Sequence, residues 1–189
     1  AVALWGDRAL IGAPVADAAT WQRDAGAAYM FTVHEGTWTQ GQKLSASDAA
    51  TGDRFGASVS LGDDRALIGA GLNDDDGTDS GSAYVFDLSG SWTQTQTLTA
   101  SGAVGGDEFG GSVSLSGDRA LVGAHLHDGT AANAGVALVY DLAPGGWSEV
   151  ADLTHADLVD GARLGYSVSV SGDRALVGAY RDIDAGSDA

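Results

Sequence analysis

The sequence FGASVSLGDDRALIGA, residues 55–70, returns twice in nearly the same form. It reads FGGSVSLSGDRALVGA over residues 109–124 and LGYSVSVSGDRALVGA over residues 164–179. The opening stretch AVALWGDRALIGA, residues 1–13, aligns with the last part of the same motif. Self-similarity at a fixed period is typical of repeat architectures, so this motif decides the fold before any local pattern does.

The repeat has a period of 54 to 57 residues, measured between the first alanines of the ALIGA or ALVGA elements. These alanines are Ala9, Ala66, Ala120 and Ala175, and a second landmark is the tryptophan at Trp38, Trp92 and Trp147. We therefore divide residues 1–189 into one segment of four repeats. Their approximate ranges are 1–52, 53–106, 107–161 and a partial 162–189.

Within the best-formed copy, four short segments show strand patterning and are bounded by Gly, Ser and Asp. They cover residues 56–62, 65–70, 82–88 and 92–100, and no segment keeps a helical period over a useful length. Four antiparallel strands at this period predict an all-β fold, a β-propeller of four-stranded antiparallel blades. About three and a half blades are present.

Two sets of glycines have specific expected roles. The Gly117-Asp118 and Gly172-Asp173 pairs suit a two-residue hairpin turn that needs positive φ at its first position. Gly69, Gly123 and Gly178 interrupt the second strand of their repeats. We predict that the backbone of a neighbouring blade approaches closely there.

The composition excludes several classes of function. The chain has 26 acidic and 9 basic residues, a formal net charge of −17 and no cysteine, so nucleic-acid binding and thiolate chemistry are not expected. No apolar run approaches the ~20 residues of a membrane span, so membrane insertion is not expected either. The acidity, with Lys43 as the single lysine, fits a protein of a salt-loving organism or an ordinary acidic secreted protein.

The motifs resemble the FG-GAP repeat, which occurs in the seven-bladed propeller of integrin α chains and in many microbial surface proteins. The resemblance rests on the FG pair, the alanine ten residues beyond its glycine (Gly56 to Ala66), the GSAYVF element and the WTQTQTL element. It implies an extracellular or cell-surface protein and a ring of seven blades. We therefore expect missing blades or a second copy of the chain to complete the ring, and favour a fragment of a longer propeller.

Strand direction predicts where the loops lie. Because strands alternate in direction across a blade, the 2–3 and 4–1 connections emerge on one face, and the length of the 2–3 connection varies most between repeats. Most acidic residues fall in these connections: Asp17, Asp24, Asp48, Asp53, Asp74, Asp75, Asp76, Asp79, Asp107, Glu108, Asp128, Asp157, Asp160, Asp182 and Asp184. We predict an acidic loop face that binds a protein or glycan ligand.

One stretch of this face has the pattern of a cation loop. In NDDDGTDSG, residues 73–81, the side chains of Asp74, Asp76 and Asp79 are candidate Ca²⁺ ligands, and a backbone carbonyl would assist. The closing Glu of the twelve-residue calcium loop is absent, so a solvated acidic loop remains the alternative. In integrin-type repeats the calcium loop lies between the first and second strands, where this chain has the short SGDR turn, so that site is not carried over.

The remaining motifs support no catalytic site. His125 and His127 form an H-x-H pair that suits a transition metal, but no third ligand has suitable spacing, and loop histidines are the favoured interpretation. Neither a G-x-S-x-G elbow nor a GxxxxGK phosphate loop occurs. We expect a non-enzymatic adhesion or ligand-binding platform. The alternatives are the propeller portion of a secreted enzyme, with catalytic residues in missing blades or another domain, and a structural spacer in a large surface protein.

Overall fold

The computed structural model describes residues 1–17, 21–129 and 131–183, which form strands and loops. Blade one contains β1 (Val2–Trp5), β2 (Arg8–Ala13), β3 (Ala27–His34) and β4 (Thr37–Leu44). Blade two contains β5 (Ser58–Leu61), β6 (Arg65–Ala70), β7 (Ser82–Leu88) and β8 (Trp92–Leu98). Blade three contains β9 (Ser112–Ser116), β10 (Arg119–Ala124), β11 (Val136–Ala143) and β12 (Gly146–Leu153). Blade four contains β13 (Leu164–Ser171) and β14 (Arg174–Ala179).

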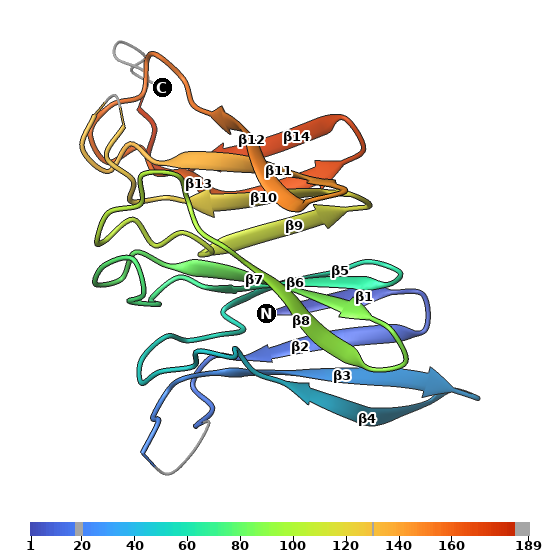
Figure 1. The fold of residues 1–189 in the computed structure, drawn as a ribbon. Helices are drawn as coiled ribbons and strands as arrows, with labels where there is room; N and C mark the ends of the chain where they lie inside the picture. Colours follow the sequence, from blue (N-terminus) through green and yellow to red (C-terminus); the bar gives the residue numbers. More distant parts are fainter. Residues whose placement is uncertain (18–20, 130, 184–189) are drawn as a thin grey trace.

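Each blade is an antiparallel sheet whose strands pair in chain order, and blade four has two strands where the others have four. The blades follow one another along the molecule, and their first strands β1, β5, β9 and β13 are neighbours in space (Figure 1). This confirms the predicted all-β fold and the three and a half propeller blades. In the described part of the chain, no helix has the length and apolar character needed to cross a membrane.

The connections sort onto two faces as expected. In Figure 1 the 2–3 and 4–1 connections gather on the left, and the 1–2 and 3–4 hairpin turns gather on the right. We call these the loop face and the hairpin face. On the hairpin face Gly117 and Gly172 both have a φ of 58°, which agrees with the turn predicted for them.

Apolar side chains fill the space between successive blades. Successive residues of the second strand point to opposite faces of the blade. Ile68 packs in the cluster shared with blade one, and Leu67 packs in the cluster shared with blade three. Both side chains are fully buried. The same positions at the two ends of the structure are open, because Ile11 is 40% exposed and Leu176 is 74% exposed. It stays a prediction that missing blades or a second copy of the chain cover these two end faces.

The glycines of the second strands allow each blade to approach the next. A Cβ atom on Gly69 would lie 1.9 Å from the carbonyl oxygen of Gly110, and one on Gly123 would lie 2.0 Å from that of Gly165. The same carbonyls accept hydrogen bonds of 2.7 Å from the hydroxyls of Ser58 and Ser112. The predicted close approach is confirmed for Gly69 and Gly123, and its partner is the FG element of the following blade.

A second contact between blades lies at the outer strands. The side-chain amide of Gln42 donates to the carbonyl of Trp92 at 2.7 Å and accepts from its amide at 2.9 Å. Gln96 bonds the backbone of Trp147 in the same way, at 2.7 and 2.8 Å. Tryptophans and glutamines of the outer strands therefore form a recurring pair of hydrogen bonds between adjacent blades.

Candidate functional site

The loop face is assembled by backbone hydrogen bonds between the blades. The amide of Phe55 donates to Ala25 at 3.0 Å, and that of Phe109 donates to Ser80 at 2.9 Å, so the start of each blade is tied to the 2–3 loop of the blade before it. Leu164 repeats this bond in blade four. The 2–3 and 4–1 connections therefore form one continuous surface with a fixed backbone.

In each of the three complete blades, one carboxylate supports the 2–3 loop by a hydrogen bond within that loop. Asp17, Asp74 and Asp128 occupy equivalent positions and accept backbone hydrogen bonds of 3.1, 2.8 and 2.7 Å. The three donors, Asp24, Asp79 and Asn133, all have positive φ, a conformation that a local hydrogen bond supports. Asp74 therefore has a structural role that recurs in every complete blade.

The predicted Ca²⁺ ligands Asp74, Asp76 and Asp79 all lie on this loop of blade two. Asp74 and Asp76 are exposed, and Asp79 is half-buried with its amide bonded to the Asp74 carboxylate. Within the described ranges, no three or more His, Asp or Glu side chains form a group with the geometry to hold a metal ion. A Ca²⁺ site made by these three residues stays a prediction, and Asp184 of the acidic set lies outside the described residues.

Two other carboxylates are almost fully buried beneath the loop face. Asp53 and Asp107 are each 2% exposed and accept the amides of Ala50 and Val104 at 2.6 and 3.0 Å. Burial raises the pKa of Asp53, although the Ala50 amide opposes that effect. These equivalent residues close the 4–1 turns and place a negative charge at the base of the next 2–3 loop.

The residue above each buried carboxylate differs between the blades. In blade three Nδ1 of His127 lies 3.1 Å from Asp107, and in blade two the equivalent residue is Asn73, which is 1% exposed. Oδ1 of Asn73 accepts the amide of Asp75 at 3.1 Å and the hydroxyl of Ser82 at 3.0 Å. Asn73 therefore fixes the 2–3 loop of blade two from within.

Blade two also gathers an acidic cluster, which we define as Asp48, Asp53, Asp75 and the hydroxyl of Tyr84. Asp75 is exposed as a residue, but partial desolvation of its carboxyl and the nearby carboxylate of Asp48 raise its pKa. Burial and the same carboxylates, Asp48 foremost, raise the pKa of Tyr84. Tyr84 is fully buried, and its hydroxyl has no hydrogen-bond partner among the described residues.

The histidine pair of blade three binds carboxylates instead of gathering toward a metal. Nε2 of His125 lies 3.5 Å from Glu108, while His127 faces Asp107. Burial, together with the charge of Arg163, lowers the pKa of His125, and burial raises the pKa of Glu108. The two histidines therefore link the 2–3 loop to the 4–1 turn that precedes it.

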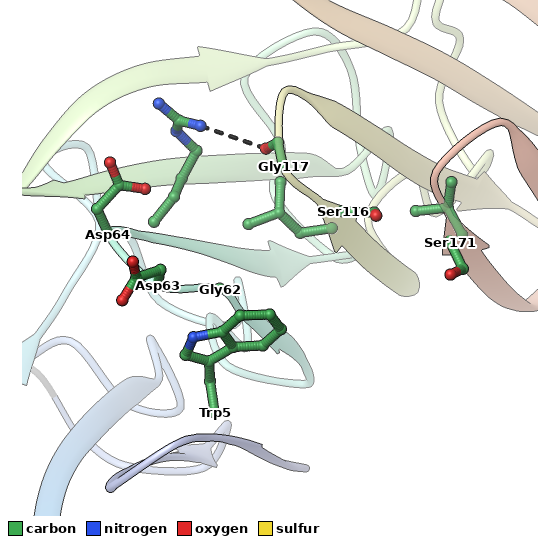
Figure 2. A pocket seen from close by; sticks show the side chains of 10 residues that line it. Trp5, Gly62, Asp63, Asp64, Ser116, Gly117 and Ser171 are labelled. Carbon is green, nitrogen blue, oxygen red and sulfur yellow. Dashed lines mark hydrogen bonds between the residues drawn. The ribbon is translucent and has the colours of Figure 1, made fainter.

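The hairpin face carries a hollow of about 290 Å³ beside the first strands (Figure 2). Trp5 lines one side of it, Asp63 and Asp64 lie next to the indole, and Ser116 and Ser171 lie across it. A guanidinium nitrogen of Arg65 donates to the carbonyl of Gly117 at 3.2 Å at its edge, which ties blade two to blade three. Part of the lining of this hollow is contact surface between blades, and part is open to solvent. None of its lining residues is a histidine, so no imidazole lies beside the carboxylates of Asp63 and Asp64.

Sequence patterns missed most of the buried polar residues. Asp53 and Asp107 were placed on the correct face but were not distinguished from the exposed acids, and neither Asn73 nor Tyr84 was identified. One signal was present: comparison of the repeats sets Asp48 against Gly102, Asp75 against Gly129 and Tyr84 against Leu138. These positions vary between the repeats, although Tyr84 has a counterpart in Tyr29 of blade one and Asp48 has one in Asp157.

Comparison with protein families agrees with the architecture. The model of the FG-GAP repeat matches residues 38–86, 92–140 and 147–189, together well over half of the chain. The first two matches begin in the outer strand of one blade and end in the third strand of the next, so each spans a junction between blades. No curated protein is significantly similar to the sequence. The chain belongs to the FG-GAP repeat family.

Proposed function

We propose that this propeller segment is a non-enzymatic ligand-binding platform of an extracellular or cell-surface protein, and that the loop face is its binding surface. The observation that carries the proposal is that the residues which hold the loops of this face are not the residues that it presents to solvent. Backbone hydrogen bonds and a few recurring carboxylates hold the loops, while other side chains point to solvent and differ from blade to blade. A rigid scaffold with variable loops is a common way to present a binding surface.

The charge of the loop face indicates the chemistry of its partner. Asp48, Asp76 and Asp157 are exposed there, and the whole chain carries a net charge of −17. A protein or glycan with basic groups would be attracted to such a surface, and its association rate would fall as salt is added. The indole of Trp21, which lies in the 2–3 loop of blade one and is 74% exposed, provides a flat apolar contact on the same face.

Two matched triple variants test the proposal. The loop-face variant carries Trp21→Ala, Asp76→Asn and Asp157→Asn. The control carries Trp38→Ala, Asp63→Asn and Asp64→Asn on the hairpin side and removes the same types of group. Both are applied to an array of matrix proteins and glycans in about 0.15 M and about 1 M NaCl.

We expect the loop-face variant to lose at least about tenfold in affinity for the ligands that bind the wild-type chain, because it removes an aromatic anchor and two charges. The control should keep its affinity. Equal losses in the two variants would contradict the proposal, as would a wild-type chain that binds no member of the array.

A further inference from the structure

We propose that the hollow on the hairpin face binds the ammonium group of a small alkylamine, held between the indole of Trp5 and the carboxylates of Asp63 and Asp64 (Figure 2). All four blades contribute to the lining of this hollow, at the ends of their first strands. The hollow lies on the opposite side of the blades from the loop face. The proposal therefore stands whether or not the loop face binds a macromolecule.

The indole is a departure from the repeat. Trp5 ends β1, and the equivalent residues of the other blades are Gly62, Ser116 and Ser171. Blades three and four thus form the same hairpin with a serine at this position. The Trp5 residue is 52% exposed, so its aromatic surface is available to a ligand.

The turn of blade two is a second departure. In the other three blades two residues form the first hairpin turn, and its glycine has a φ of 56° or 58°. These glycines are Gly6, Gly117 and Gly172. In blade two Asp63 replaces the glycine without adopting that conformation, and residues 62–64 connect β5 to β6. The amide of Gly62 donates to the carbonyl of Arg65 at 2.7 Å, and the wider turn places two consecutive carboxylates beside the indole (Figure 2).

The indole and the acidic turn are joined through Arg8. Trp5 and Arg8 are cross-strand neighbours in the β1–β2 hairpin, and a guanidinium nitrogen of Arg8 donates to the carbonyl of Asp63. The same contact recurs at the next junction, where Arg65 donates to the carbonyl of Gly117 at 3.2 Å. A contact that the repeat uses between blades therefore fixes the aromatic side of the hollow relative to its acidic side.

The carboxylates of the turn lack the charge partner that the repeat provides at the next junction. In blade three Asp118 occupies the position of Asp64 and pairs with Arg65 of blade two at 3.2 Å. The corresponding arginine of blade one, Arg8, lies 3.9 Å from Asp7 instead. Arg65 also lines the hollow, but Asp118 and a carboxylate of its own blade at 2.8 Å already engage its guanidinium. The two carboxylates of the turn therefore give the hollow an excess of negative charge.

The lining favours an ammonium ion on a short apolar chain. An indole face attracts a cation, and carboxylates accept its N–H groups. Leu115 and Val170 add apolar surface to the same hollow. An organic cation is favoured over a metal ion, because no group of three or more His, Asp or Glu side chains in the described ranges has the geometry to hold a metal. The volume of about 290 Å³ suits a small amine or the end of one lysine side chain.

Calorimetric titration of the whole chain with n-butylammonium chloride tests the site, with NaCl holding the ionic strength constant. We expect one binding site with a Kd on the order of 1 mM, because an exposed indole and two exposed carboxylates each contribute modestly in water. n-Butanol, which has the apolar chain without the charge, should bind at least about tenfold more weakly. Absence of n-butylammonium binding, or equal binding of n-butanol, would overturn the proposal.

Two matched double variants locate the ammonium ion. Trp5→Ser with Asp63→Gly introduces residues that other blades carry at these positions, so we expect the fold to be kept and the affinity to fall at least about tenfold. Trp21→Ser with Asp76→Gly removes the same two groups from the loop face and should bind normally. An equal loss in the two variants would show non-specific attraction to an acidic chain and would refute the site.

Asp63→Asn keeps the test decisive if the first double variant unfolds. It retains the size of the side chain and removes one charge, so the affinity for n-butylammonium should fall at least about twofold with little change in Tm. Unchanged affinity in this variant would contradict the role given to the acidic turn.

A blocked lysine, Nα-acetyl-lysine amide, distinguishes the two sources of the ammonium group. Binding within about threefold of n-butylammonium would identify the site as one for a lysine of a partner protein, and binding at least about tenfold weaker would restrict it to free amines. Both results uphold the site. In the ligand array, a protein lost by the hairpin-side variant alone would be bound at this hollow and not on the loop face.

Discussion

Blade two and blade three share one backbone frame on the loop face and differ in the side chains that it carries. In both, a buried carboxylate accepts an amide of the 4–1 turn, at Asp53 and at Asp107. Above that carboxylate blade three places an imidazole, whereas blade two places an amide and further acids. The contacts that recur are those the fold needs, so the positions that differ are free to serve binding.

The largest effect should come from a change to the shared frame. Gly69→Ala and Gly123→Ala would each place a Cβ within about 2 Å of a carbonyl oxygen of the next blade. The clash is with backbone rather than with a flexible side chain, so neither strand can move away at low cost. We expect each variant to lose more than about 3 kcal/mol of unfolding free energy, measured by urea denaturation. Gly41→Ala is the control, because its nearest atom would be 3.5 Å away.

The two glycine variants also test how far the blades are equivalent. Similar losses at Gly69 and Gly123 are expected, because the approaching carbonyls belong to equivalent FG glycines. A loss below about 1 kcal/mol at either position would show that this junction is looser than the structure describes.

A smaller effect should distinguish the blades. Asp107→Asn keeps an oxygen for the Val104 amide but weakens the contact with His127, so we expect a loss of about 1–2 kcal/mol at neutral pH. Asp53→Asn should cost less or stabilise the chain, because it relieves repulsion from Asp48 and Asp75. Urea denaturation with a chelator present measures both, and equal losses would argue against repulsion in the acidic cluster.

The serines of the first strands should again behave alike in the two blades. Ser58→Ala and Ser112→Ala each remove a 2.7 Å hydrogen bond to the next blade, and a loss of about 1 kcal/mol is expected for each. Ser89→Ala, in an exposed turn, provides the control for thermal unfolding. If only one of the two serines matters, the hydrogen bonds between blades are not interchangeable.

The repeat predicted the blade itself well, because alternation and bounding glycines act locally. The predicted strands 65–70 and 82–88 coincide with β6 and β7. The first strand was predicted from residue 56 but β5 begins at Ser58, since Phe55 bonds the preceding blade and Gly56 packs against it. Strand alternation also placed the acids on one face. Burial of Asp53 and Asp107 could not be predicted, because it depends on a loop about twenty residues further along the chain.

The weakest of the predicted effects is a dependence of stability on pH, to which blade two contributes through Asp53 and Asp75. Folding raises the pKa values of Asp53 and Asp75 above 3.8, so the folded chain binds more protons than the unfolded chain as the pH falls through those values. Tm should therefore rise as the pH is lowered toward the raised pKa values of Asp53 and Asp75, by an amount worth less than about 1 kcal/mol because Asp75 is exposed. Asp53→Asn with Asp75→Asn should flatten the rise, and an unchanged profile would contradict it.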